Sequence, residues 1–138
     1  MKKIVLISCV SKKLPHKAKA KDLYVSPLFK LNLAYAQSLN PDAIYILLAK
    51  YGLLDLDTEI EPYDVTLIKM SARQVRAWAQ DVLRQLENRV NLKIDHFIFL
   101  AGNNYRKYLI PYIKSYEVPL EGLPIGRQLQ YLSKRPHE

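Results

Sequence analysis

The 138-residue sequence contains little sulfur, with one cysteine, Cys9, and two methionines. A disulfide needs two thiols, so an internal disulfide is excluded. This fits the reducing cytoplasm, where we expect the protein to be located. The length is that of one domain and allows a genuine apolar core, so no covalent staple is needed for folding.

Long apolar runs are absent as well. None approaches the roughly 18 residues that cross a membrane, so we expect no membrane partner. The apolar run near the N-terminus stops at Val10, and lysines resume at Lys12. It is too short for the apolar region of a signal peptide, and no small-residue cleavage site follows it. We interpret this run as a buried strand.

The sequence also lacks the common signatures of metal and cofactor sites. Its three histidines are scattered, and no His/Cys spacing suggests zinc. Segment 9–26 contains no glycine, which excludes a Gly-rich phosphate cradle there. No Gly-x-Ser-x-Gly elbow is present. We therefore expect neither a metal ion nor a cofactor.

Charge is present in excess of one sign. The net charge is +8, and residues 1–30 hold eight lysines against one acid, Asp22. Residues 55–64 hold five acids and no Lys or Arg. A basic surface attracts phosphates and nucleic acid. Alternatively, the acidic segment neutralises part of the basic one and the remaining lysines face solvent.

Four short apolar runs predict buried strands at residues 3–8, 44–49, 96–101 and 115–118. The first three do not alternate with polar residues, which is typical of parallel strands covered on both faces. Helical periodicity predicts helices over 27–39, 71–90, 103–113 and 124–132, with Ser26 and Ser71 as N-caps of the first two. The first helix would place these residues inward: Leu28, Leu31, Ala34, Tyr35 and Leu39.

The alternation of strands and helices predicts a single α/β domain over residues 1–138. We expect a three-layer α/β/α arrangement with a parallel sheet of about four strands in the order 2-1-3-4. Ligands of such sheets bind beyond the carboxyl ends of the strands, where the strand order reverses. The loops 9–26, 50–70 and 101–104 leave those ends, and the first two are unusually long.

The first loop offers a thiol, hydroxyls, ammonium groups and a phenol. Cys9, beside lysines, is a candidate nucleophile, although a lone cysteine at a strand end also suits a small buried position. Lys21 is a second candidate nucleophile, because a desolvated lysine attacks electrophilic carbon. If these lysines stay exposed, they only attract phosphate or face solvent. The candidate ligand-binding residues of this loop are Ser8, Ser11, Lys12, Lys13, Tyr24 and Ser26.

The later loops supply the remaining candidates. Lys50 directly follows a buried strand, and Asp64 and Glu121 are candidate acid/base groups. Asp64 would equally suit a turn, and Glu121 a helix cap. We expect Cys9, Lys50, Gly102 and Glu121 around one crevice. The candidate ligand-binding residues here are Tyr51, Gly52, Tyr63, Gly102 and Tyr105.

Several ordered blocks make the sequence resemble a bacterial and phage family of uncharacterised function. They are Ser8-Cys9-x-Ser11-Lys12-Lys13, Ala20-Lys21-Asp22-Leu23-Tyr24-x-Ser26-Pro27-Leu28-Phe29, Ala49-Lys50-Tyr51-Gly52-Leu53-Leu54, Pro62-Tyr63-Asp64, Ala101-Gly102-x-x-Tyr105 and Pro119-Leu120-Glu121-Gly122-Leu123-x-Ile125-Gly126-x-Gln128-Leu129. The match covers nearly the whole chain.

Two further resemblances are more distant. The blocks at Tyr51 and Pro62 are similar to those of the larger peroxide-stress YaaA proteins, which implies a link to DNA binding and oxidative stress. A looser likeness is to the catalytic core of archaeosine synthase, which acts on a 7-deazaguanine base through a lysine. That core has a lysine-proline-tyrosine block and a serine near its N-terminus. The nearest matches here are Lys21, Tyr24 and Ser26, although Asp22-Leu23 stands in place of the proline.

Two functional hypotheses remain open. The first is a small enzyme that acts on a nucleobase, nucleotide or nucleic acid at the carboxyl edge of the sheet. Lys21 or Lys50 would be its nucleophile or cation, and Glu121 or Asp64 its acid/base. The second is a noncatalytic nucleic-acid-binding module in stress response or phage defence, which would use the same basic edge.

Overall fold

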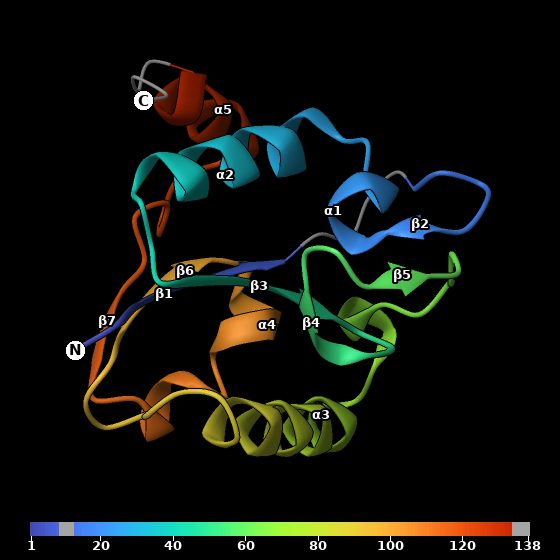
Figure 1. The fold of residues 1–138 in the computed structure, drawn as a ribbon. Coiled ribbons are helices and arrows are strands. Elements are labelled where there is room, and N and C mark those ends of the chain that lie inside the picture. Colours follow the sequence, from blue (N-terminus) through green and yellow to red (C-terminus); the bar gives the residue numbers. More distant parts are fainter. Residues whose placement is uncertain (9–12, 134–138) are drawn as a thin grey trace.

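A computed structural model describes residues 1–8 and 13–133, and these form a mixed α/β fold around a five-stranded sheet. The strand order is β4-β3-β1-β6-β7 (Figure 1). Four strands run parallel: β1 (Lys3–Ser8), β3 (Ala43–Leu48), β6 (His96–Leu100) and β7 (Ser115–Glu117). The fifth, β4 (Gly52–Asp55), is antiparallel to β3.

The α/β class and the mostly parallel sheet agree with the sequence-based prediction, but the predicted strand count was too low. Segment 50–70 was expected to be one long loop at the carboxyl edge. Instead the chain reverses directly after β3, so that Leu48 pairs with Gly52 and Ile46 with Leu54. Leu53 is buried by this pairing. The additional strand therefore lengthens the sheet beyond β3.

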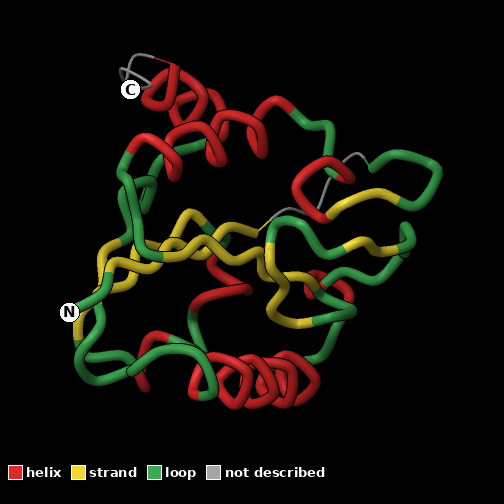
Figure 2. Tube along the Cα trace, in the orientation of Figure 1, coloured by secondary structure: helices red, strands yellow, loops and turns green. Residues whose placement is uncertain are grey.

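Helices lie on both faces of the sheet. Figure 1 shows α2 (Pro27–Ser38) and α5 (Ile125–Ser133) on one face, and α3 (Ala72–Glu87) and α4 (Asn103–Arg106) on the other. The strands occupy the layer between them (Figure 2). Shorter pieces complete the described chain: α1 (Ala20–Leu23), η1 (Leu67–Lys69) and η2 (Ile110–Tyr112). None of the described helices is long and apolar enough to cross a membrane.

Both predicted N-caps are confirmed. The Ser26 hydroxyl accepts a hydrogen bond from the Phe29 N–H, and Ser71 forms a reciprocal capping box with Gln74 at the start of α3. The third predicted helix is shorter than expected. It ends at Arg106, and a separate 3₁₀ turn contains Pro111. Proline lacks an amide N–H and blocks the preceding turn, so the helix does not continue through it.

Side chains of β1 alternate between two apolar clusters, one on each face of the sheet. Ile4 and Leu6 pack with α3, whereas Val5 and Ile7 pack with α2 and α5. Helix α2 does not bury the predicted stripe of leucines and alanine, whose members are only half-buried. Its buried residues are Phe29, Asn32 and Ala36. The helix packs against both the sheet and α5, so its inward face is rotated from the one that hydrophobicity alone predicts.

The two long loops meet in a small sheet of their own. Strand β2 (Ala18–Lys19) pairs antiparallel with β5 (Glu59–Ile60), and the amides of Ala20 and Lys21 donate to the carbonyls of Thr58 and Leu56. Each loop thus satisfies backbone groups of the other. This brings the lysine-rich and acidic segments side by side.

The amino edge of the sheet is tied together by one buried carboxylate. Asp95 accepts hydrogen bonds from the backbone N–H groups of Asn91, at 2.8 Å, and Lys2, at 2.9 Å. The bond from Asn91, reinforced by that from Lys2, lowers the pKa of Asp95 below its ordinary value although burial opposes this. The carboxylate therefore stays charged at neutral pH and fixes the entry into β1 and β6.

Candidate functional site

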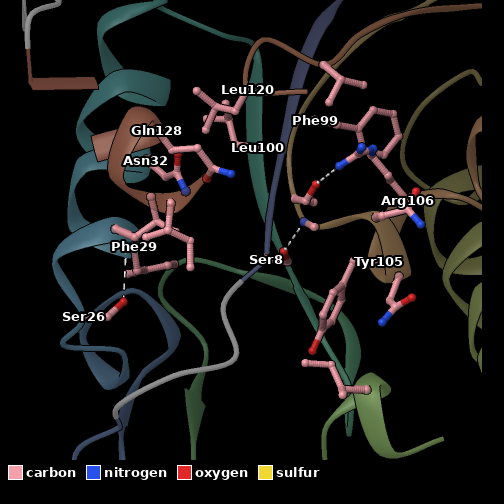
Figure 3. Close-up of a pocket in the computed structure, with 18 residues that line it drawn as sticks. Ser8, Ser26, Phe29, Asn32, Phe99, Leu100, Tyr105, Arg106, Leu120 and Gln128 are labelled. Atoms are coloured by element: carbon pink, nitrogen blue, oxygen red, sulfur yellow. Dashed lines mark hydrogen bonds between the residues drawn. The ribbon is translucent and has the colours of Figure 1, made fainter. Parts of the chain in front are cut away.

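A crevice of about 430 Å³ opens at the carboxyl ends of β1 and β6 (Figure 3). From β1 the chain leads to α2 on one face, and from β6 it leads to α4 on the opposite face (Figure 1). The neighbouring strands β3 and β6 lie on either side of β1. This is the point where the strand order reverses, and open α/β sheets bind ligands there.

The floor of the crevice joins the ends of these two strands. The Gly102 N–H donates to the Ser8 hydroxyl oxygen at 3.1 Å. Gly102 has an extended backbone conformation that any residue adopts, and a Cβ added to it would meet no atom within 4 Å. The glycine is therefore not required by packing, and its bare backbone faces open space within the crevice.

The walls of the crevice are largely apolar and come from both helix layers. Phe29 and Leu120 contribute on the side of α2 and α5, and Phe99 and Leu100 contribute from β6 (Figure 3). Ile68 and Ile125 also line it, and both are exposed large hydrophobic residues. Apolar walls with a few converging polar groups are typical of small-molecule sites.

The most unusual polar group of the crevice is the Asn32 side chain on α2. Asn32 is only 3% exposed, lines the crevice, and its Oδ1 atom has no hydrogen-bond partner among the described residues. An unsatisfied buried polar atom costs about 1–3 kcal/mol. Nearby, Gln128 on α5 donates to the Leu123 carbonyl at 2.8 Å through Nε2. The two amides line the same side of the crevice (Figure 3).

The cation of the crevice is Arg106 at the end of α4. Its side chain is 14% exposed, and Nη1 donates to the Ala101 carbonyl at 2.7 Å. Nη2 lies 3.7 Å from the Glu121 carboxylate, which is itself 70% exposed. This distance allows an ion pair without a hydrogen bond. The guanidinium thus has donors left for an additional anionic partner.

The structure brings four predicted ligand-binding residues together at this crevice, namely Ser8, Ser26, Gly102 and Tyr105. Tyr105 is buried and packs edge-on against Trp78 with ring centroids 5.5 Å apart. Glu121 reaches the same place through its ion pair with Arg106. Ser8 and Gly102 therefore share one edge of the sheet, whereas Cys9, which we expected at this crevice with Gly102, lies outside the described residues.

Three predicted tyrosines form a separate cluster around Lys13. The hydroxyls of Tyr24 and Tyr63 are 2.5 Å apart, and Tyr51 packs edge-on against Tyr63. The Lys13 ammonium lies 4.9 Å from the ring centroid of Tyr63 and 5.7 Å from that of Tyr24. These distances are those of cation–π contacts. The cluster joins the two long loops and does not line the crevice.

Lys50 does not share the crevice, which corrects the prediction that it lies there with Gly102. Lys50, Tyr51 and Gly52 line a different hollow, beside Gln85 of α3. Gly52 has φ +73°, as the sharp reversal into β4 requires, and an added Cβ would overlap the Gln85 side chain. The turn into β4 therefore carries Lys50 away from the strand ends that form the crevice.

The remaining candidates lie elsewhere or outside the described residues. The Lys21 ammonium is 3.4 Å from the Asp57 carboxylate, so it faces the acidic loop. Asp64 is exposed. Cys9, Ser11 and Lys12 fall outside the described residues. Within the described chain, no group of three or more His, Cys, Asp or Glu side chains could hold a metal ion.

Sequence reasoning missed three residues as ligand-binding candidates: Asn32, Arg106 and Gln128. Asn32 lies one turn after Phe29, on the buried face of α2. A polar residue on a buried face is a signal for a binding site, but the sequence shows that Asn32 is on that face only when the rotation of α2 is known. Arg106 lies one turn after Gly102, and that spacing could have identified it. Gln128 depends on how α5 docks, which no local pattern specifies.

The profile of one protein family, described as "Family of unknown function (DUF6884)", matches residues 4–134. The chain belongs to this family. The match runs from the second residue of β1 to beyond the end of α5. No curated protein and no solved structure matches the chain. The crevice of this family member therefore has to be interpreted from its own chemistry.

Proposed function

We propose that this family member binds a nucleobase or nucleotide in the crevice between β1 and β6 and acts on it there as a small enzyme. The observation that carries the proposal is the unsatisfied Oδ1 atom of Asn32. A leucine or alanine at that position would avoid the cost of burying an amide. Once the side chain turns toward the crevice that it lines, an N–H donor of a bound ligand would satisfy this oxygen.

The other groups of the crevice match the remaining parts of such a ligand. Phe29 and Leu100 offer apolar surfaces for a flat ring, and the amides of Asn32 and Gln128 suit the hydrogen-bonding edge of a base. Arg106 supplies donors for a phosphate or a carboxylate. The volume of about 430 Å³ lies in the range of sites for small organic ligands.

The chemistry within this proposal rests on Glu121 and Arg106. Glu121 lies beside the Arg106 guanidinium, and in this proposal its carboxylate exchanges a proton with a ligand held by that cation. Arg106 would stabilise negative charge that develops during reaction. Lys21 and Lys50 have no part in it, since Lys21 contacts Asp57 and Lys50 lines another hollow.

The proposal is tested by thermal-shift measurements with free bases, nucleosides and nucleoside 5′-monophosphates. A ligand present at 100 times its Kd stabilises a protein by about 2.7 kcal/mol. We expect a shift with at least one member of this panel, and loss of that shift in Asn32→Leu. Asn88→Leu is the matched control, since Asn88 is an exposed asparagine at the end of α3. A shift that survives Asn32→Leu would place the ligand elsewhere.

Glu121→Gln separates an enzyme from a binding module that uses the same crevice. The substitution keeps the size of the side chain and removes its charge. If the protein is an enzyme, the variant should bind the ligand that the panel identifies and fail to convert it, as followed by mass spectrometry of that ligand. Unchanged ligand with the wild-type protein would favour the noncatalytic alternative.

A further inference from the structure

A surface beside the crevice carries several exposed cations that form no ion pair within the described chain. Residues 65–80 and 103–114 contain six Lys and Arg and no Asp or Glu. Four of these cations are exposed on η1, α3 and the end of α4, and we call them the α3–α4 basic surface: Lys69, Arg73, Arg76 and Lys107.

Contacts hold these residues on one surface although they come from separate segments. Helix α4 packs against η1. The Arg76 guanidinium lies 5.7 Å and the Lys107 ammonium 5.1 Å from the ring centroid of Tyr108. Gln80 of α3 donates to the Tyr112 hydroxyl at 3.3 Å, and Tyr112 is 54% exposed. Two cations thus share one tyrosine, and a second tyrosine is exposed beside them.

The four cations differ from the five Lys and Arg residues of the described chain that pair with acids. Within the described chain, none of the four forms an ion pair, whereas Lys19, Lys21, Arg84 and Arg89 each contact an aspartate. Like charges at this density repel each other unless an anionic partner covers them. The α3–α4 basic surface therefore suits a polyanion.

This surface is continuous with the crevice. Ile68 and Arg106 line the crevice, and Lys69 and Lys107 are the next residues along the chain. A polyanion that covers the surface would therefore pass the mouth of the crevice. Cations interleaved with exposed aromatic rings are typical of proteins that bind single-stranded nucleic acid, because phosphates contact the cations and bases stack on the rings.

We propose that a single strand of nucleic acid lies along the α3–α4 basic surface and inserts one unpaired base into the crevice. This inference rests on the proposed function, because it assumes that a base binds in the crevice and adds that this base is part of a strand. A base inside a duplex cannot reach such a cavity without leaving its stack, so a single strand is the expected substrate. The phosphates on either side would contact Arg76 and Lys107, and a neighbouring base would stack on Tyr112.

The test measures fluorescence anisotropy of labelled 12-nucleotide single strands of DNA and RNA over a range of salt concentrations. Arg76→Gln/Lys107→Gln removes two cations from the surface, and Lys17→Gln/Lys30→Gln removes two exposed lysines from elsewhere. We expect the first variant to bind the strand at least about tenfold more weakly, with the slope of log K against log salt reduced by about 1.4. The control pair should bind within about twofold of wild type.

Measurements on mononucleotides separate this inference from the proposed function. Arg76→Gln/Lys107→Gln should leave the thermal shift by the mononucleotide unchanged, because neither residue lines the crevice. Asn32→Leu should abolish that shift and also weaken strand binding. Equal losses of strand binding in the two charge variants would overturn the inference and leave the proposed function standing.

Two other outcomes would also overturn parts of this picture. Strand binding that depends on Arg76 and Lys107 but not on Asn32 would show that no base of the strand enters the crevice, which overturns this inference. The mononucleotide shift and its loss in Asn32→Leu would still test the proposed function separately. Binding of anionic phospholipid vesicles in the absence of any strand binding would show that the basic surface serves a membrane instead.

Discussion

Two basic regions of this protein differ in whether acidic residues of the same chain pair with their cations. In the paired loops, which comprise residues 13–23 and 55–64, Lys19 and Lys21 contact Asp57 and Lys13 lies against tyrosine rings. On the α3–α4 basic surface, Arg76 and Lys107 both lie near the ring of Tyr108, and neither forms an ion pair within the described chain. The first region has its partners within the chain, and the second does not.

The difference shows that the density of lysines along a sequence does not locate a positive surface. The densest run of lysines lies in residues 1–30, and it led to the expectation that Lys12, Lys13 and Lys21 contact the ligand. Strands β2 and β5 then place the acidic loop against part of that run. The less conspicuous cations Lys69, Arg73, Arg76 and Lys107 form no ion pair within the described chain, and we propose that they contact another molecule. The following predictions test this contrast between internally paired and unpaired polar groups.

The largest effect on stability is expected at Asp95, the most fully paired carboxylate. Asp95→Asn weakens two charge-assisted hydrogen bonds, from Asn91 and Lys2, and should lower the free energy of unfolding by about 3 kcal/mol. Because folding lowers the pKa of Asp95, its contribution is present above the unfolded pKa of about 4 and is lost as the pH falls through the folded value. Urea unfolding from pH 7 to pH 2.5 measures the difference in the free energy of unfolding between wild type and variant, and this difference should shrink below about pH 4. A difference that stays constant with pH would contradict this account.

The opposite sign is expected at Asn32, where a polar atom lacks an internal partner. Asn32→Leu should raise the free energy of unfolding by about 1–2 kcal/mol, because it removes an unsatisfied buried oxygen and adds apolar contact. Chemical denaturation of the apo-protein measures this directly. Asn88→Leu, at an exposed position, should change stability by no more than about 0.5 kcal/mol. Destabilisation by Asn32→Leu would show that the amide has a structural partner.

A smaller effect is expected at Gly102, whose backbone faces open space. Gly102→Ala should leave stability unchanged or raise it by about 0.4–1 kcal/mol, since its backbone conformation suits alanine. The added methyl group should nevertheless weaken the thermal shift by a mononucleotide. Gly122→Ala is an informative contrast, because Gly122 has φ +79° and alanine is strained there. Full ligand affinity in Gly102→Ala would show that the ligand keeps away from the crevice floor.

The smallest effect is expected from unpairing the lysines of the loops. Asp57→Asn removes the acid beside Lys19 and Lys21, both of which are partly exposed, so stability should change by less than about 1 kcal/mol. Strand binding should become slightly tighter, by up to about threefold at low salt. Glu87→Gln, which removes a different exposed acid, is the charge-matched control. If Asp57→Asn strengthened binding as much as the surface variant weakens it, the two regions would be equivalent after all.

Much of the fold could be predicted because its signals are local. The apolar runs of β1, β3 and β6 and the serine caps of α2 and α3 act within a few residues. Strand β4 was missed because its four residues follow a glycine turn and gain their burial from pairing with β3 and from packing against α3. The β2–β5 pair was missed because each strand has only two residues, which is too short to show a periodic pattern.

The candidate site could be predicted only as far as topology determines it. The rule for strand ends led us to expect that the loops 9–26 and 101–104 leave the same edge of the sheet, and the Gly102 N–H donates to the hydroxyl of Ser8 at the end of β1. The rule failed for Lys50, because the chain turns back into β4 before it can cross the sheet edge. Asn32 and Gln128 depend on how α2 and α5 rotate and dock against each other, and a helical pattern with apolar residues on several sides leaves that rotation open.

The central position of β1 has a consequence for the order in which the chain can fold. Its partners are β3 on one side and β6 on the other. The middle of the sheet is complete only when Lys3 of β1 pairs with His96 of β6, which lies far along the chain. Contacts between residues so distant in sequence slow folding, because a long loop has to close first. During synthesis β1 emerges from the ribosome well before β6 and keeps one unpaired edge until β6 follows. Until then, the apolar residues from Ile4 to Ile7 offer that edge to other chains, so the interval before β6 appears is when this protein is most prone to aggregate.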